Sequence, residues 1–279
     1  MTHTGYYSEI VIPVANAADA ARLIYLLSGL GFDGFMEEEQ TLKAYIPLEQ
    51  WDEKLLNGIL GHDGKPLQYT RKTIAPRNWN SQWEKQFQPV TIDGRIHIRA
   101  GFHPPPPPGV MDIIITPKMS FGTGHHETTE LMIRLLADLD TDGLHVIDMG
   151  SGTGVLAILA EKTCARHIDA IDNDQWAYEN MKENFRTNEC HRIEAYWGGK
   201  EVLKKLPPAD VLLANINLNI ILDGLPYFKE RVKKGGHLIL SGFYETDVPA
   251  VRHLLPPDQW EETRRMVKNR WIGIEFVRK

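Results

Sequence analysis

From residue 111 onward, short apolar runs alternate with longer amphipathic segments. The short runs predict strands over residues 144–149, 168–171, 193–196, 211–214, 237–241, 264–270 and 272–278. The segments between them predict helices over residues 127–139, 155–164, 175–188, 219–232 and 247–254. Strands that alternate with helices form βαβ units and a parallel sheet. This part of the chain therefore predicts a doubly wound α/β domain whose ligand binds at the carboxyl ends of the strands.

The first 75 residues follow a different pattern. Apolar alternation predicts strands over residues 6–14, 34–38, 42–47 and 67–74, and amphipathic spacing predicts helices over residues 17–30 and 49–60. Asn16 and Asp19 suit the start of the first helix, and Gly29 and Gly31 suit its end. The order β-α-β-β-α-β is that of a ferredoxin-like α+β domain.

The segment between these two parts predicts a connecting helix and a hairpin. Trp79, Trp83 and Phe87 recur every four residues, which is the spacing of one helix face. Asp93-Gly94 is a dipeptide that suits a two-residue turn between strands 90–92 and 95–98. The run of prolines over 104–108 predicts a stiff, exposed loop. We therefore expect a small domain over residues 1–75, a linker helix over 76–89 and a large domain over 90–279.

Composition and charge narrow the class of protein. A chain of 279 residues with 42% hydrophobic residues is long enough for two globular domains. No apolar run reaches membrane-spanning length and no signal peptide is visible, so we expect a cytoplasmic protein that has no membrane contact. Cys164 and Cys190 are too few for a disulfide framework or a zinc site made of cysteines.

The net charge of −6 is concentrated at the start of the chain, where residues 1–65 hold ten acidic and four basic residues. An acidic module repels phosphate backbones and attracts a basic partner, although it also serves solubility alone. Because no basic face is apparent elsewhere, we expect no direct nucleic-acid binding.

A glycine-rich turn indicates a cofactor site. Gly150, Gly152 and Gly154 follow the predicted strand 144–149 and precede a predicted helix, which is the context of a nucleoside-binding loop. Asp172 ends the next strand, where its carboxylate can accept hydrogen bonds from ribose hydroxyls. The spacing G-x-G-x-G with Asp148 before it favours S-adenosylmethionine, which carries an ammonium and no pyrophosphate, over NAD.

These motifs resemble Class I methyltransferases and, within them, the PrmA family, which methylates large-subunit ribosomal protein eleven. The resemblance is carried by residues 117–129 (PKMSFGTGHHETT), the strand and loop over 146–154, Ile171-Asp172, Ala214-Asn215-Ile216 and the segment 79–89 (WNSQWEKQFQP). It covers nearly the whole chain and implies a Rossmann-like fold for the large domain. It also implies that the cofactor contacts Thr129, Gly150, Asp172 and Asn215, and that a loop of Phe121, Gly122, Thr123 and Gly124 covers its methionine end.

Three adjoining potential metal ligands, His125, His126 and Glu127, lie within this motif. Their spacing differs from that of a helical H-E-x-x-H zinc site, so we expect no metal there and a helix-capping or loop-fixing role for His125 and Glu127.

The resemblance implies an enzyme that methylates lysine side chains, and the α-amino group as a further acceptor, of ribosomal protein eleven, with the small domain gripping the substrate. Asn215 is the candidate catalytic residue, because its amide can orient the acceptor amine but cannot act as a strong base. The sequence 215–218 reads NINL instead of Asn-Pro-Pro-Tyr, so it names no aromatic residue that would clamp the acceptor. The alternatives are methylation of an amine in another protein or a small molecule, and a non-catalytic factor that binds the ribosomal protein.

Overall fold

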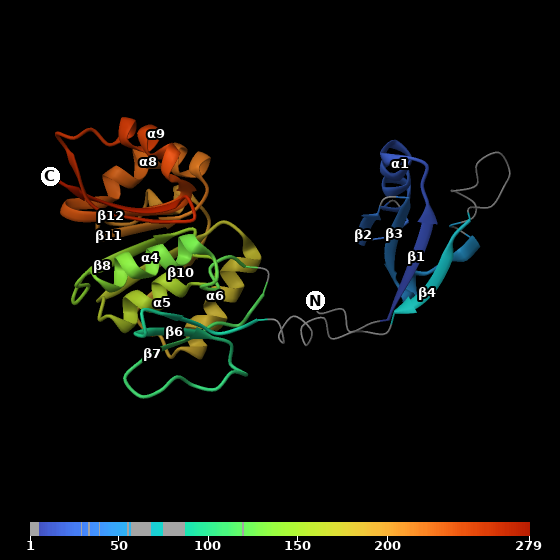
Figure 1. Cartoon of the computed structure of the whole chain (residues 1–279), viewed down its shortest axis with the longest axis horizontal. Coiled ribbons are helices and arrows are strands. Elements are labelled where there is room, and N and C mark those ends of the chain that lie inside the picture. Colours follow the sequence, from blue (N-terminus) through green and yellow to red (C-terminus); the bar gives the residue numbers. More distant parts are fainter. Residues whose placement is uncertain are drawn as a thin grey trace. The chain divides into compact units, whose positions relative to one another are not determined.

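The structure is a computed structural model that describes residues 6–28, 30–32, 34–38, 40–54, 56, 68–74, 87–118 and 120–279. The chain divides into two compact units, Met1–Trp83 and Glu84–Lys279 (Figure 1). The predicted linker helix over 76–89 falls almost wholly outside the described residues, so it stays a prediction. None of the helices in the described ranges is long and apolar enough to cross a membrane.

The small unit is built on a four-stranded antiparallel sheet in the order β2-β3-β1-β4. Its elements are β1 (Tyr7–Pro13), α1 (Ala17–Ser28), β2 (Gly34–Glu38), β3 (Thr41–Pro47), a 3-10 turn (Leu48–Gln50) and β4 (Thr70–Ile74). The backbone N–H of Asp19 donates to Oδ1 of Asn16 over 3.0 Å, as expected for the predicted start of α1. In the segment predicted as a second helix, residues 49 and 50 belong to the 3-10 turn, and residues 55 and 57–60 lie outside the described residues, so the ferredoxin-like assignment stays a prediction.

The large unit contains a seven-stranded sheet in the order β10-β9-β8-β11-β12-β14-β13. Its strands are β8 (His145–Met149), β9 (His167–Asp172), β10 (Ile193–Trp197), β11 (Ala209–Asn215), β12 (Val232–Tyr244), β13 (Trp260–Lys268) and β14 (Trp271–Arg278). The first five strands in this order are parallel, and β14 and β13 are added antiparallel. The chain order reverses between β8 and β11, which makes their carboxyl ends the switch point where such sheets bind ligands. The predicted doubly wound α/β fold is confirmed.

Helices cover both faces of this sheet (Figure 1). They are α4 (Glu127–Ala137), α5 (Val155–Lys162), α6 (Gln175–Thr187), α7 (Lys200–Leu203), α8 (Leu218–Arg231) and α9 (Val248–Leu254). One apolar core packs α4, α5 and α6 on one face, and a second packs α7, α8 and α9 on the other. All five residues of β8 are buried, as expected for a strand covered on both sides.

A separate three-stranded sheet precedes the large sheet in the chain and consists of β5 (Val90–Ile92), β6 (Ile96–Arg99) and β7 (Met111–Ile114). The predicted hairpin at Asp93-Gly94 forms, with φ of 50° and 68° at these two residues. Because Ile92 pairs with Ile96, its connection has three residues, 93–95, instead of the predicted two. The proline run over 104–108 lies in a largely exposed loop, also as predicted. That loop joins the parallel strands β6 and β7, so the region is not a simple hairpin.

The last hairpin differs from its predicted boundaries. The turn between β13 and β14 lies at Asn269 and Arg270, whereas the sequence pattern extended a strand through both residues. Their φ values of 48° and 71° belong to the left-handed region. A turn of this kind usually contains glycine. Because residues 269 and 270 are not glycine, the sequence pattern did not predict the turn.

Candidate cofactor and acceptor site

The glycine loop after β8 is shaped by close contacts that leave no room for side chains. Gly150, Gly152 and Gly154 have φ of 75°, 57° and 81°. A Cβ on Gly150 would lie 2.2 Å from Cγ2 of Ile216, and one on Gly154 would lie 2.4 Å from a ring carbon of Phe185. The loop therefore packs against the turn after β11 and against α6 at the switch point.

The segment predicted to cover the cofactor lies against this glycine loop. The backbone N–H of Thr153 donates to the carbonyl oxygen of Phe121 over 2.8 Å, and its hydroxyl donates to that of Gly122 over 2.6 Å. A Cβ on Gly152 would lie 2.3 Å from the Phe121 carbonyl oxygen. Two segments whose contacting residues are 31 positions apart in the sequence, Gly122 and Thr153, thus form one cradle.

The other two residues of the predicted covering loop contact different partners. Thr123 Oγ1 lies 3.2 Å from Nδ1 of His125, and a Cβ on Gly124 would lie 2.7 Å from Cδ1 of Ile98 in β6. The close approach of Gly124 to Ile98 places the loop against the small three-stranded sheet. Their position gives Thr123 and Gly124 a role in holding the loop, whereas Phe121 and Gly122 reach the glycine loop itself.

Asp172 at the end of β9 is tied to the same loop. Its Oδ2 accepts a hydrogen bond from the backbone N–H of Gly152 over 2.8 Å, and its Oδ1 accepts one from that of Asp174 over 2.9 Å. Burial raises the pKa of Asp172, and the two backbone donors oppose that effect. Because each carboxylate oxygen can accept more than one hydrogen bond, both can still bind ribose hydroxyls.

Asp148 lies below the loop and is 1% exposed. Its Oδ2 accepts a hydrogen bond from the Ser151 hydroxyl over 2.5 Å, whereas its Oδ1 has no hydrogen-bond partner. Burial raises the pKa of Asp148 to about 7, and the Ser151 hydrogen bond offsets only part of that effect. An unpartnered buried carboxylate oxygen is costly in the free protein, and a nearby cation would stabilise it.

Asn215 ends β11 and is 8% exposed. Its Nδ2 lies 3.4 Å from Oγ1 of Thr129, a fully buried residue in the first turn of α4. Its Oδ1 is buried and has no hydrogen-bond partner, so the amide is held from one side and keeps one unsatisfied acceptor on the other. The arrangement suits a residue that orients a hydrogen-bond donor such as an amine.

Sequence analysis missed a ladder of asparagines on α6. Asn184 and Asn188 accept hydrogen bonds from the backbone N–H groups of Thr116 and Ile114 over 2.8 and 2.9 Å. Asn184 also donates to the carbonyl oxygen of Thr153 over 2.8 Å. The signal was present, because Asn180, Asn184 and Asn188 recur every four residues and so lie on one helix face.

Two exposed tryptophans beside Asp172 were also missed. Trp176 is 78% exposed near the start of α6, and Trp197 is 58% exposed at the end of β10. Trp197 Nε1 donates to the carbonyl oxygen of Asn173 over 3.1 Å, which fixes its ring next to the end of β9. Both rings are available for contact with a flat apolar group of a ligand.

The adjoining His125, His126 and Glu127 point to different partners. His126, not His125 or Glu127, caps α4 by accepting a hydrogen bond from the N–H of Thr128. Nε2 of His125 lies 2.8 Å from the carbonyl oxygen of Gln88, which is a loop-fixing contact, and Glu127 accepts a hydrogen bond from Asn269.

A different histidine cluster lies at the opposite end of the sheet. Oδ2 of Asp169 is 2.6 Å from Nε2 of His145, and its Oδ1 is 3.0 Å from Nε2 of His167. Both carboxylate oxygens are thus used by the two imidazoles. The prediction that no metal is bound stays a prediction.

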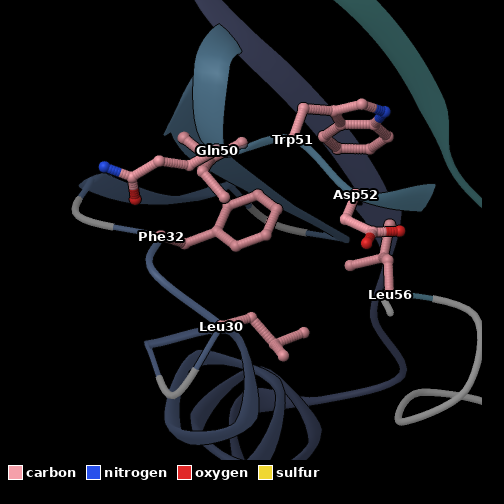
Figure 2. Close-up of a pocket in the computed structure, with 7 residues that line it drawn as sticks. Leu30, Phe32, Gln50, Trp51, Asp52 and Leu56 are labelled. Atoms are coloured by element: carbon pink, nitrogen blue, oxygen red, sulfur yellow. The ribbon is translucent and has the colours of Figure 1, made fainter. Parts of the chain in front are cut away.

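A cavity in the small unit is lined by Leu30, Phe32, Ile46, Gln50, Trp51, Asp52 and Leu56 (Figure 2). Five of these side chains are apolar, so the cavity lacks the set of polar partners that a nucleoside requires. We assign it no part in cofactor binding.

The residues of the large unit fit S-adenosylmethionine. Asp172 retains acceptor capacity for ribose hydroxyls, and the unpartnered oxygens of Asp148 and Asn215 suit a cationic ligand and an amine. The loop reads G-x-G-x-G, whereas the loop that binds a pyrophosphate in a dinucleotide site reads G-x-G-x-x-G. Chemically, the site can present a nucleoside-bound electrophile to a donor that Asn215 orients.

Comparisons with known proteins point to one family. A model of the family described as ribosomal protein L11 methyltransferase (PrmA) matches residues 29–279. The chain is 39% identical over 255 residues to the ribosomal protein L11 methyltransferase of Porphyromonas gingivalis, covering 90% of this chain and 88% of that protein. It is 38% identical over 258 residues to that of Phocaeicola vulgatus, covering 91% and 92%. A crystal structure of ribosomal protein L11 methylase from Lactobacillus delbrueckii subsp. bulgaricus is similar with a TM-score of 0.63 and 25% identity, over 69% of this chain and 100% of that one.

Proposed function

Because the chain belongs to the ribosomal protein L11 methyltransferase family, we propose that it methylates lysine side chains, and the α-amino group as a further acceptor, of ribosomal protein L11. The protein is an S-adenosylmethionine-dependent methyltransferase that modifies a protein, which excludes the NAD-dependent and non-catalytic alternatives. One observation in the site supports an amine acceptor. The unpartnered Oδ1 of Asn215 lies at the switch point, next to the glycine loop.

The roles of the cofactor-binding residues follow from their contacts. We propose that Asp172 binds the ribose hydroxyls, and that the backbone of Gly150, Gly152 and Gly154 contacts the body of the cofactor. Phe121 and Gly122, held by Thr153, lie over its methionine end. Asp148 stabilises its ammonium electrostatically, and Thr129 holds the Asn215 amide through their 3.4 Å contact.

Methyl transfer requires little acid or base chemistry from the chain. S-adenosylmethionine, when bound, supplies an electrophilic methyl group whose bond to sulfur breaks with its electron pair left on sulfur. The acceptor nitrogen forms the new N–C bond with its lone pair, so a lysine ammonium must first lose a proton to water. Asn215 Oδ1 accepts a hydrogen bond from the remaining N–H and aims the lone pair. The main contribution of the chain is therefore positioning.

We further propose that the small unit is a ferredoxin-like domain that grips the substrate, followed by a linker helix. Its exposed carboxylates include Glu49, Asp52 and Glu53, which suit a basic partner. Action on a ribosomal protein supports a cytoplasmic location. A protein substrate is also consistent with the expectation that the chain binds neither nucleic acid nor a membrane directly.

Mass spectrometry of ribosomal protein L11 after incubation with this protein and S-adenosylmethionine tests the proposed function. We expect added methyl masses on lysine residues with the full chain. A chain that begins at residue 84 should bind the cofactor with unchanged affinity but methylate L11 at least 100-fold more slowly, because the substrate grip is missing. Unmodified L11 would contradict the proposed substrate, and full activity of the shortened chain would contradict the proposed role of the small unit.

Cofactor affinity should depend on the ionisation of Asp148, whose pKa in the free protein is raised to about 7. The cofactor ammonium favours the charged carboxylate, so binding must expel a proton from Asp148 below that pH. We expect affinity to fall by up to about tenfold per unit as the pH drops from 7 towards 5, where the ammonium itself stays charged. Calorimetric titration in two buffers of different ionisation enthalpy measures the released proton.

The variant Asp148→Asn is the control for this pH dependence, because it keeps an acceptor for the Ser151 hydroxyl but cannot ionise. Its cofactor affinity should be weaker at pH 7 and nearly flat between pH 5 and 7. A wild-type protein with equally flat affinity would show that Asp148 does not face the ammonium.

A further inference from the structure

Four aromatic rings form a continuous row where the carboxyl end of β12 meets the amino end of β14. The ring centroids are 5.2 Å apart for Phe121 and His126, 4.9 Å for His126 and Trp271, and 4.3 Å for Trp271 and Tyr244. Phe121 is 51% exposed and Tyr244 is 40% exposed, so both ends of this aromatic row reach solvent. His126 and Trp271 between them are partly buried, so the row runs from solvent to solvent across the surface and is a candidate binding surface.

Trp271 and Tyr244 lie on the side of Asn215 away from Asp172, whereas Phe121 at the other end of the aromatic row lies against the glycine loop. Trp271 pairs with Tyr244 across β14 and β12, and Asn215 pairs with Ser241 across β11 and β12. In the strand order, β9 and β8 carry Asp172 and the glycine loop on one side of β11, whereas β12 and β14 follow on the other. A group bound by Trp271 and Tyr244 therefore approaches Asn215 from the side opposite Asp172.

The row already holds a cation at one end. The guanidinium carbon of Arg270 lies 5.5 Å from the centroid of the Tyr244 ring. Aromatic faces attract ammonium and guanidinium groups electrostatically, and they also pack against methylene stems. A lysine side chain offers both features, since it carries a terminal amine on an unbranched stem.

The turn that presents Trp271 is held in a costly conformation. Arg270 and Asn269 adopt φ of 71° and 48°, where glycine would be less strained. Asn269 donates to Oε1 of Glu127 over 3.0 Å, and Lys268 pairs with Glu130, so the turn is anchored to the first turns of α4. Backbone strain persists where the surroundings impose it, and it is concentrated at functional sites.

We propose that the aromatic row binds the side chain of the acceptor lysine, with the methylene stem against Trp271 and the nitrogen directed towards Asn215. The row thereby selects an unbranched alkylamine over an amide or hydroxyl acceptor. The proposal rests on the proposed function and supplies the acceptor-binding aromatic residue that residues 215–218 lack.

The full-length variant Trp271→Leu tests the row by steady-state kinetics with L11 at saturating cofactor. We expect kcat/KM for L11 to fall at least tenfold, chiefly through KM, while the dissociation constant of the cofactor stays within twofold of wild type. Trp271→Phe should recover most of the loss because it restores an aromatic face. Val267→Ser is the matched control, since Val267 is an apolar residue, 46% exposed, on the same hairpin. It should change neither constant.

Unchanged kcat/KM for L11, or a fall matched by lost cofactor affinity, would overturn the proposal. If Trp271→Leu does not fold, Tyr244→Leu at the exposed end of the aromatic row is used in its place. The same results for kcat/KM and for cofactor affinity then support or overturn the proposal.

Binding of a small ammonium compound tests the aromatic row independently of the proposed function. We expect n-butyltrimethylammonium to bind the wild-type protein at least fivefold more tightly than n-butanol, and this preference should disappear in Trp271→Leu. If wild-type protein leaves L11 unmodified, the proposed function fails. In that case, a preference for the ammonium probe still supports an amine-binding aromatic row, and the absence of this preference overturns it.

Discussion

The variant Gly152→Ala should lose at least 100-fold in cofactor affinity and most of its methyltransferase activity. The added Cβ would lie 2.3 Å from the carbonyl oxygen of Phe121, a backbone atom that cannot turn aside. The glycine loop and the segment 121–124 would have to separate, which breaks the cradle that Thr153 closes. A 100-fold loss corresponds to about 2.8 kcal/mol of binding free energy. Isothermal titration with S-adenosylmethionine measures it directly.

Gly143→Ala is the matched control for this variant. Gly143 has φ of 70°, but a Cβ there meets nothing within 4 Å. It therefore carries the backbone strain of a left-handed alanine, about 1 kcal/mol of unfolding free energy, without the collision. Cofactor affinity should stay at the wild-type value in Gly143→Ala. Equal cofactor affinities in Gly152→Ala and Gly143→Ala would contradict the proposal that the contact between Gly152 and Phe121 shapes the cofactor site.

The second large effect is expected for Asn215→Ala, whose kcat for L11 should fall about 100-fold. The amide is fixed through its 3.4 Å contact with Thr129, and its unpartnered Oδ1 is the acceptor that orients the amine. Loss of such orientation costs rate more than binding, because the cofactor retains Asp172 and the glycine loop. Single-turnover kinetics and calorimetry should therefore show a large change in rate and at most a tenfold change in the dissociation constant of the cofactor.

Asn217→Ala separates the role of Asn215 from local destabilisation. Asn217 caps α8, where its Oδ1 accepts a hydrogen bond from the backbone N–H of Ile220 over 3.2 Å. Removing this cap should lower the unfolding free energy by about 1 kcal/mol without a comparable loss of kcat. A wild-type kcat in Asn215→Ala would contradict the proposed role of Asn215 in orienting the acceptor amine.

The sequence pattern predicted most of the large unit because its strands are short apolar runs bounded by polar turns. It underestimated β12, which spans Val232–Tyr244 instead of residues 237–241. The extra length includes Phe243 and Tyr244, which pair with Ile272 and Trp271 of β14, so it depends on a partner strand that is distant in the sequence. The four-residue helix α7 was missed, since a single turn leaves no periodicity to detect.

The candidate site was predicted in parts and not as a whole. Gly150, Gly152 and Asp172 are recognisable because a strand, a turn and a helix adjoin in sequence, and local order alone places them together. The contact between Thr153 and Phe121, the asparagine ladder of α6 and the aromatic row join segments that are distant in the chain. No local pattern records such contacts.

By itself, the sequence determined the class of fold, the nucleoside-binding loop and the family, because periodicity, glycine spacing and local motifs are properties of neighbouring residues. Only the tertiary structure decided which side chains meet. It brought His126, Trp271 and Tyr244 into one row beside Asn215, and it left Oδ1 of Asp148 and of Asn215 without partners. The physical reason is that hydrogen bonds and ring contacts act over a few ångströms, and the packing of β11, β12, β14 and α4 sets those distances.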